Sequence, residues 1–160
     1  MNYPSVLVLI ADDWSPIARC YDHSSVRTPR IDALAERSTV FTQAFCTTPS
    51  CAASRANLLT GLYSHQHGQF GHCHGVHHFQ TYDHVDTLPA VLNRLGVFTG
   101  LIGKDHVAPA SGYPFDVSAG NADAWDTGRL ARRVRDFLAE SPGRPFYLQA
   151  ASTYPHRTGP

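Results

Sequence analysis

Cys51 and Arg55 lie four positions apart in the stretch CAASRANLLTG, whose composition and closing glycine predict a short helix. The first turn of a helix carries unpaired N–H groups and the positive end of the macrodipole, so an anion is favoured there. Arg55 is one turn further along and can extend over the same face. A cysteine phosphatase would need an arginine six positions after its nucleophile, and Asn57 stands there. The pair therefore indicates an anion site that differs from that of a cysteine phosphatase. The alternative is that Cys51 is simply a small, buried hydrophobic residue.

Two adjacent acids, Asp12 and Asp13, follow the aliphatic run VLVLI at residues 6–10. A run of this kind predicts a strand buried on both faces, with the acids at its carboxyl end. Adjacent carboxylates that face a cavity repel each other unless a cation neutralises them, and oxygen ligands suit Ca²⁺ or Mg²⁺. The pair indicates a divalent-metal site, with capping of the next turn as the alternative.

Polar groups also follow two later predicted strands. Residues 97–102 are followed by GKDH, which contains Lys104 and His106, and residues 145–152 are followed by His156. Taken singly, each of these side chains could be a solvated surface group. Because the carboxyl ends of parallel strands meet at one edge of a sheet, we expect these groups to gather beside the acids.

The elements that must position these groups alternate along the chain. Helices are expected over 28–38, 52–59, 87–95 and 125–140, an extended segment over 40–45, a long ordered loop over 62–86, and a turn-rich segment over 109–121. Alternating strands and helices predict a three-layer α/β/α fold with a mostly parallel sheet.

The composition limits the classes of partner. The 160 residues are 42% hydrophobic and 16% charged with a net charge of zero, which argues against disorder and against a general affinity for nucleic acid. The first apolar run is too short to span a membrane and lacks the basic flank of a signal peptide. As it stands, the sequence predicts a cytoplasmic protein without a membrane partner, whose four cysteines are thiols.

The stretch CAASRANLLTG resembles the sulfatase signature CxPSRxxxLTG, with Ala53 in place of proline, a variant that also occurs in that family. LIADD, GKDH and TYPHR resemble further sulfatase segments in the family's order, so the resemblance covers nearly the whole chain. It implies an alkaline phosphatase-like fold in which residues 1–160 form the amino-terminal part of the catalytic domain, incomplete at the carboxyl end. Relatives in this family are often exported or lysosomal.

The resemblance also implies a nucleophile and a metal site. Cys51 would be oxidised to formylglycine by a maturation enzyme, and one hydroxyl of the hydrated aldehyde would attack the sulfur of a sulfated sugar. Asp12, Asp13 and position 51 would bind the divalent metal, with Ca²⁺ expected and Mg²⁺ as the alternative. In the family, later residues complete this metal site, and they would lie beyond position 160.

Four further side chains receive roles from the same resemblance. Arg55 would stabilise the reactive oxygen, and Lys104 would hold a sulfate oxygen. His156 would protonate the leaving group. His106 would take the proton of the second hydroxyl, so that the aldehyde re-forms and sulfate is expelled without attack of water on sulfur. These groups supply the positive charge and donors that a transferring sulfuryl group needs.

Six of the ten histidines lie in HQHGQFGHCHGVHH, residues 65–78. The longer stretch GLYSHQHGQFGHCHGVHHFQTYDHV resembles the sulfatase subgroup that cleaves the N-linked sulfate of glucosamine in heparan-type sugars. We therefore expect N-sulfoglucosamine as the substrate, bound by His77 and His78. Solvated or mutually hydrogen-bonded loop histidines are one alternative, and a structural zinc at the HxH spacings is another.

Two other functions stay open at this point. A phosphomonoester, phosphodiester or phosphonate hydrolase of the same superfamily would use the same metal and nucleophile. A catalytically silent module would bind the sulfated sugar and keep Cys51 unmodified. For the assembly, a homodimer is one expectation.

Overall fold

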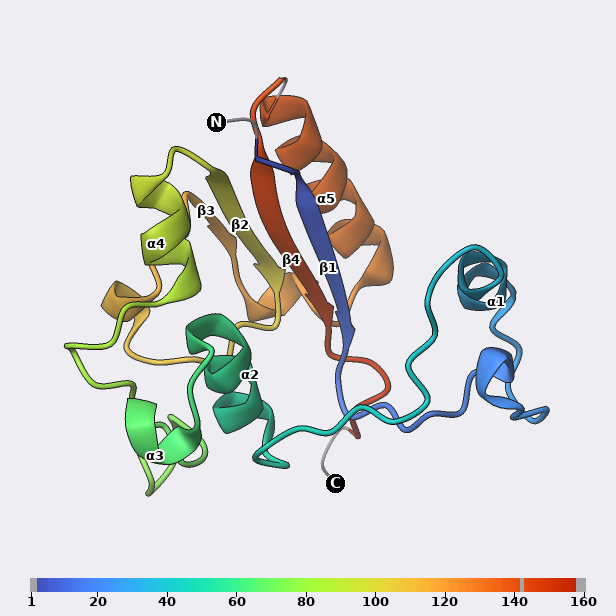
Figure 1. The fold of residues 1–160 in the computed structure, drawn as a ribbon, viewed down its shortest axis with the longest axis horizontal. Helices are drawn as coiled ribbons and strands as arrows, with labels where there is room; N and C mark the ends of the chain where they lie inside the picture. The colour runs from blue at the N-terminus through green and yellow to red at the C-terminus, as the bar shows by residue number, and fades with distance from the viewer. Residues whose placement is uncertain (1–2, 142, 158–160) are drawn as a thin grey trace.

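The computed structural model describes residues 3–141 and 143–157. Its centre is a four-stranded sheet in the order β1-β4-β2-β3, in which every neighbouring pair is parallel (Figure 1). The strands are β1 (Val6–Ala11), β2 (Phe98–Gly103), β3 (Val117–Ala119) and β4 (Phe146–Ser152). The predicted parallel α/β architecture is confirmed. The last strand in the sequence lies between the first two.

Helices cover both faces of this sheet. α5 (Thr127–Glu140) lies on one face, and α2 (Cys51–Thr60) and α4 (Leu88–Arg94) lie on the other (Figure 1). The remaining helical segments are α1 (Pro29–Ala35), α3 (Ser64–His67), and the 3₁₀ turns η1 (Arg19–Tyr21), η2 (Ala110–Gly112) and η3 (Asn121–Asp123). The expected helices are confirmed with small shifts at their ends. Among the described residues no helix is long and apolar enough to cross a membrane.

Two apolar clusters stabilise the layers. Phe137 of α5 is 1% exposed and packs with Phe98, Ile102 and Leu148. On the opposite face, Leu59 of α2 packs with Val97, Tyr113 and Tyr147. Tyr147 and Leu148 are consecutive in β4, and successive side chains of a strand point to opposite faces. β4 is therefore part of both cores.

The register of the strands brings their carboxyl ends to one edge. Ala11 of β1 pairs with Ser152 of β4, and Gly103 of β2 pairs with Ala151. The Lys104 N–H donates to the Ala151 carbonyl at 2.9 Å. The residues that follow β1, β2 and β4 consequently leave the sheet side by side, at the position where ligands bind in open α/β sheets.

The prediction that the first strand is buried on both faces is wrong. β1 is an edge strand, paired only with β4 among the described residues. Leu7 and Leu9 are 46% and 70% exposed. The aliphatic run specified the strand correctly, but such a run cannot show which neighbours cover it.

Three shorter segments also differ from the sequence-based expectation. The segment 40–45 has no regular structure, and its Phe41 and Phe45 side chains are exposed. The turn-rich segment contains β3, which extends the sheet by three residues. The long loop over 62–86 contains one helical turn, α3. Helix α1 forms as expected, but its Leu34 is 51% exposed and none of its residues is buried.

Candidate functional site

A buried ion network lies at the carboxyl edge of the sheet. The Asp12 carboxylate accepts from Arg55 Nη2 at 3.0 Å through one oxygen and from Lys104 Nζ at 2.5 Å through the other. Arg55 Nη1 also donates to the Lys104 carbonyl at 2.9 Å. All three residues are buried. Asp12 directly follows β1, Lys104 directly follows β2, and Arg55 belongs to α2, so the network connects the elements that meet at the edge.

The charge state of Asp12 follows from this pairing. Burial alone would raise the pKa of the carboxyl, but hydrogen bonds and charges from Lys104 and Arg55 outweigh it and lower the pKa. Asp12 is therefore ionised at neutral pH. The adjacent acids were expected to require a cation. For Asp12, the side chains of Arg55 and Lys104 supply that positive charge.

Cys51 is the first residue of α2, and Ser50 is its N-cap residue in an extended conformation. The Ser50 side chain makes no capping hydrogen bond, so the first N–H groups of the helix are not satisfied by it. The helix ends at Gly61, whose φ of 69° and N–H bond to the Asn57 carbonyl form the expected left-handed cap. The helix start thus presents Cys51 and Arg55 to the same region.

A cavity of about 820 Å³ opens at this helix start. Asp12, Asp13, Cys51, Arg55 and His156 all contribute to its wall. Asp13 is exposed and has a positive φ of 58°. The cavity is large enough for a monosaccharide with its charged substituent. Five of the residues selected from the sequence therefore meet in one place.

Lys104 and His106 adjoin that cavity without being part of its wall. The Lys104 side chain donates a hydrogen bond to Asp12, which lines the cavity. His106 lies near Cys51 and has a positive φ of 59°. Its ring stacks against His72 and His74 at centroid distances of 5.2 and 5.1 Å. Burial and the positive charge of Lys104 lower the pKa of His106 to about 4, so its imidazole is neutral at neutral pH.

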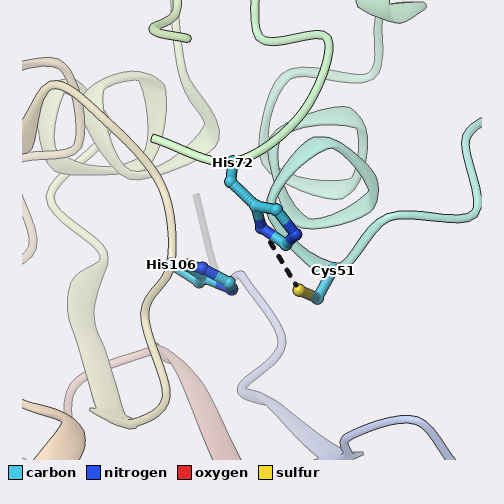
Figure 2. Close-up of side chains that lie close together, drawn as sticks. All are labelled: Cys51, His72 and His106. Carbon is cyan, nitrogen blue, oxygen red and sulfur yellow. Dashed lines mark hydrogen bonds between the residues drawn. The ribbon is translucent and has the colours of Figure 1, made fainter. Parts of the chain in front are cut away.

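Cys51, His72 and His106 form a cluster in which one ligand atom of each residue lies within 4.8 Å of the others. Figure 2 shows the His72 ring above the sulfur and the His106 ring beside it. Cys51 Sγ and His72 Nδ1 are 3.9 Å apart. His74 Nε2 is 2.9 Å from His106 Nε2.

The structure places His77 and His78 away from these groups. Both are exposed, His77 stacks on Phe79 at 5.8 Å, and neither contributes to the cavity wall. His72 and His74, from the same loop, reach the site in their place. This loop has no sequence period that could rank its histidines, although the HxH spacing at 72–74 indicated that this pair lies close together.

Sequence reasoning also missed a polar network that fixes the far end of α2. Asn57 Oδ1 accepts from Ser64 Oγ at 3.2 Å and from His67 Nε2 at 2.5 Å. His67 Nδ1 accepts from the Gln69 N–H at 3.1 Å, and burial lowers the pKa of His67. This neutral histidine connects α2 to the loop that carries His72.

The chain is similar to known proteins in sequence and in fold. A family model described as sulfatase matches residues 4–160. Human N-sulphoglucosamine sulphohydrolase is 45% identical over 97% of this chain and 32% of its own length. The chain spans about a third of the length of the curated relatives it matches.

Solved structures share the fold. A protein solved in complex with its substrate D-glucosamine-2-N,6-O-disulfate has a TM-score of 0.80 at 22% identity, over 98% of this chain and 35% of that one. Phosphonate monoester hydrolase of Agrobacterium radiobacter has a TM-score of 0.72 at 20% identity, over 97% of this chain and 42% of that one. Identities this low concern the fold alone.

Proposed function

This chain belongs to the sulfatase family, and we propose that residues 1–160 form the amino-terminal part of a catalytic domain that hydrolyses a sulfate ester or N-sulfate. The observation that carries the proposal is the meeting of Cys51, Arg55, Asp12 and Asp13 on one cavity wall. A nucleophile precursor at a helix start, a buried guanidinium and two acids are the groups that transfer of an anionic group requires.

For the substrate, we favour the N-sulfate of glucosamine in heparan-type sugars. The support is the 45% identity to the human enzyme whose name states that chemistry. A fold shared with a protein that binds D-glucosamine-2-N,6-O-disulfate agrees with this preference. His77 and His78 are exposed outside the cavity wall, so we propose that they contact a part of the sugar that extends beyond it.

Formylglycine at position 51, made by a maturation enzyme, would supply a hydrated aldehyde with two hydroxyl groups. Arg55 is held by Asp12 and by the Lys104 carbonyl, so its guanidinium is oriented on the cavity wall that it shares with position 51. Lys104 uses one of its N–H donors on Asp12 and keeps others for a sulfate oxygen. The neutral His106 is in the state needed to accept a proton.

His156 is the candidate proton donor to the leaving group. It lies on the cavity wall, and its Nδ1 is 2.6 Å from the Arg157 carbonyl. An Nδ1–H donating to that carbonyl leaves Nε2 free to carry the transferable proton. The proposal assigns His156 the acid role and His106 the base role.

The acids fit a hard divalent cation. Asp12 and Asp13 line the same cavity as position 51, and all their donor atoms are oxygens. Asp12 is already paired with two cationic side chains, whereas Asp13 forms no ion pair with a described residue. The family implies a divalent metal. We propose Ca²⁺, with Mg²⁺ as the alternative, held by Asp12, Asp13 and the oxygen of a converted position 51.

Turnover by the longer protein that contains residues 1–160, coexpressed with a formylglycine-generating enzyme, tests the proposal. We expect little or no turnover from residues 1–160 alone, because later residues would complete the metal site. We expect sulfate release from N-sulfated glucosamine to exceed hydrolysis of a phosphonate monoester. Replacing Cys51→Ser should abolish release, because serine provides only one hydroxyl. Cys46→Ser is the matched control, since Cys46 is exposed on the same cavity wall. Preferential phosphonate hydrolysis would contradict the sulfatase proposal and favour the function of the phosphonate monoester hydrolase, whose fold this chain shares.

A further inference from the structure

We propose that, before conversion, the chain binds a thiophilic metal ion such as Zn²⁺ through Cys51, His72 and His106. This site shares position 51 with the proposed carboxylate site for a hard cation but differs from it in its ligands, which are one sulfur and two imidazoles. The ligand atoms already lie within 4.8 Å of one another. Tetrahedral zinc with Zn–S and Zn–N bonds of roughly 2.3 and 2.0 Å places ligand atoms roughly 3.3–3.6 Å apart, so shifts of about an ångström complete the site.

The environment of His106 independently points to a ligand. Its Nδ1 is buried and has no hydrogen-bond partner among the described residues. Its Nε2 lies 2.9 Å from His74 Nε2, so a third imidazole borders the cluster. Buried polar atoms are normally satisfied, and an ion or water is a usual partner when they are not.

The three ligands come from elements that the fold fixes in place. Cys51 begins α2, His72 lies on the loop that His67 connects to that helix, and His106 follows β2 (Figure 2). The loop histidines stack with His106, which restricts their ring orientations. The bound ion therefore requires little ordering of the chain, and preorganisation of this kind favours binding.

The surrounding charges permit a cation. Arg55 and Lys104 are positive, but both contact the Asp12 carboxylate, and Asp13 adds a second negative charge on the cavity wall. Binding replaces the proton of the Cys51 thiol with a metal–sulfur bond and releases that proton to solvent, without any redox change. The thiolate adds one further negative charge to the site.

The ion and the aldehyde exclude each other at position 51, because conversion removes the sulfur. This consequence rests on the proposed function, whereas metal binding by the unconverted thiol does not. Zinc occupancy would accordingly protect Cys51 from the maturation enzyme. The described chain has four free cysteines, and Cys51 is the one within 4.8 Å of two histidine ligand atoms.

Titration of the reduced, unconverted chain with Co²⁺ and then Zn²⁺ tests the inference. We expect one Co²⁺ per chain with a thiolate-to-cobalt charge-transfer band, displaced by Zn²⁺. Cys51→Ser should remove the band and weaken Zn²⁺ binding by at least about tenfold, and His72→Gln should weaken it similarly. Cys46→Ser and His77→Ala are matched controls from the same wall and the same loop, and both should leave the band and affinity unchanged.

Circular dichroism of every variant establishes that it is folded, and His72→Gln replaces Cys51→Ser as the deciding variant if the latter does not fold. A cobalt spectrum that persists in the folded deciding variant would overturn the inference, as would equal losses in the control variants or no binding by the unsubstituted chain. Conversion of Cys51 in a chain that binds no zinc would refute the zinc site and leave the proposed function standing.

Discussion

The Asp12 carboxylate holds two buried cations, and Asp12→Asn tests how far the site depends on it. The amide removes the negative charge and leaves Arg55 and Lys104 buried beside each other. Loss of one partner of a buried pair costs about 3 kcal/mol or more, and we expect the free energy of unfolding to fall by that amount in urea titrations. Asp86→Asn removes half of an exposed ion pair with Arg94 and should change stability little. Equal effects from the two substitutions would contradict the buried network.

The pKa of His106 makes stability depend on pH. Its folded-state pKa is lowered from 6.5 to about 4, so between these values the unfolded chain binds a proton that the folded chain does not. Stability is therefore unaffected by this group above pH 6.5 and falls as pH drops from 6.5 toward about 4. Asp12, whose pKa is lowered from 3.8, contributes a further loss as pH falls below that value.

Urea midpoints between pH 7.5 and 4.5 would reveal this slope. His106→Gln should flatten it, because glutamine does not titrate. The buried His67, whose pKa is also lowered, should account for part of the slope that remains. An unchanged slope in the His106→Gln variant would show that this ring binds protons equally in the folded and unfolded chain, and would contradict a lowered pKa.

At the scale of elements, the close approach of β2 to β4 decides where Lys104 lies. Gly103 has a φ of +91°, and a Cβ there would meet the Ala151 carbonyl oxygen at 2.1 Å. Gly96 has a similar φ of +75° with nothing within 4 Å of a Cβ. Gly103→Ala should therefore destabilise the fold by about 1–3 kcal/mol more than Gly96→Ala, as measured by urea unfolding. Equal costs would mean that the strand contact is not restrictive.

Elements with a strong local signal could be predicted from the sequence. The runs at 97–102 and 145–152 became β2 and β4, and Gly61 ended α2. β3 could not be predicted, because three residues in a turn-rich segment carry no period. The exposure of β1 was also beyond prediction, since it depends on the strand order rather than on the strand's own residues.

The site residues, like the elements, were predictable where the local sequence signal was strong and unpredictable where tertiary contacts decide. Groups at the ends of predicted strands and at the start of a predicted helix, such as Asp12 and Cys51, could be placed together from topology. The histidine loop could not be ranked, because its conformation is set by contacts such as that between His67 and Asn57. For this reason His72 was missed in favour of His77.

At the scale of the whole molecule, β4 joins two apolar cores and should make unfolding cooperative. Phe137→Ala removes a ring that is 1% exposed, at a cost of about 3–5 kcal/mol. The neighbouring Leu138 is 40% exposed, and its replacement by alanine should cost under about 1 kcal/mol. Circular dichroism and tryptophan fluorescence should give coincident transitions in both variants. Two separate transitions after Phe137→Ala would show that the faces of the sheet fold independently.

The central claim is that position 51 becomes the nucleophile of a sulfatase, and tandem mass spectrometry of the tryptic peptide 38–55 tests it most directly. The peptide contains Cys46 as an internal reference. After coexpression with a formylglycine-generating enzyme, we predict a mass lower by about 18 Da at position 51 and none at position 46, because conversion is a covalent change. An intact cysteine at position 51 under those conditions would contradict the account and favour a silent module that binds sulfated sugar.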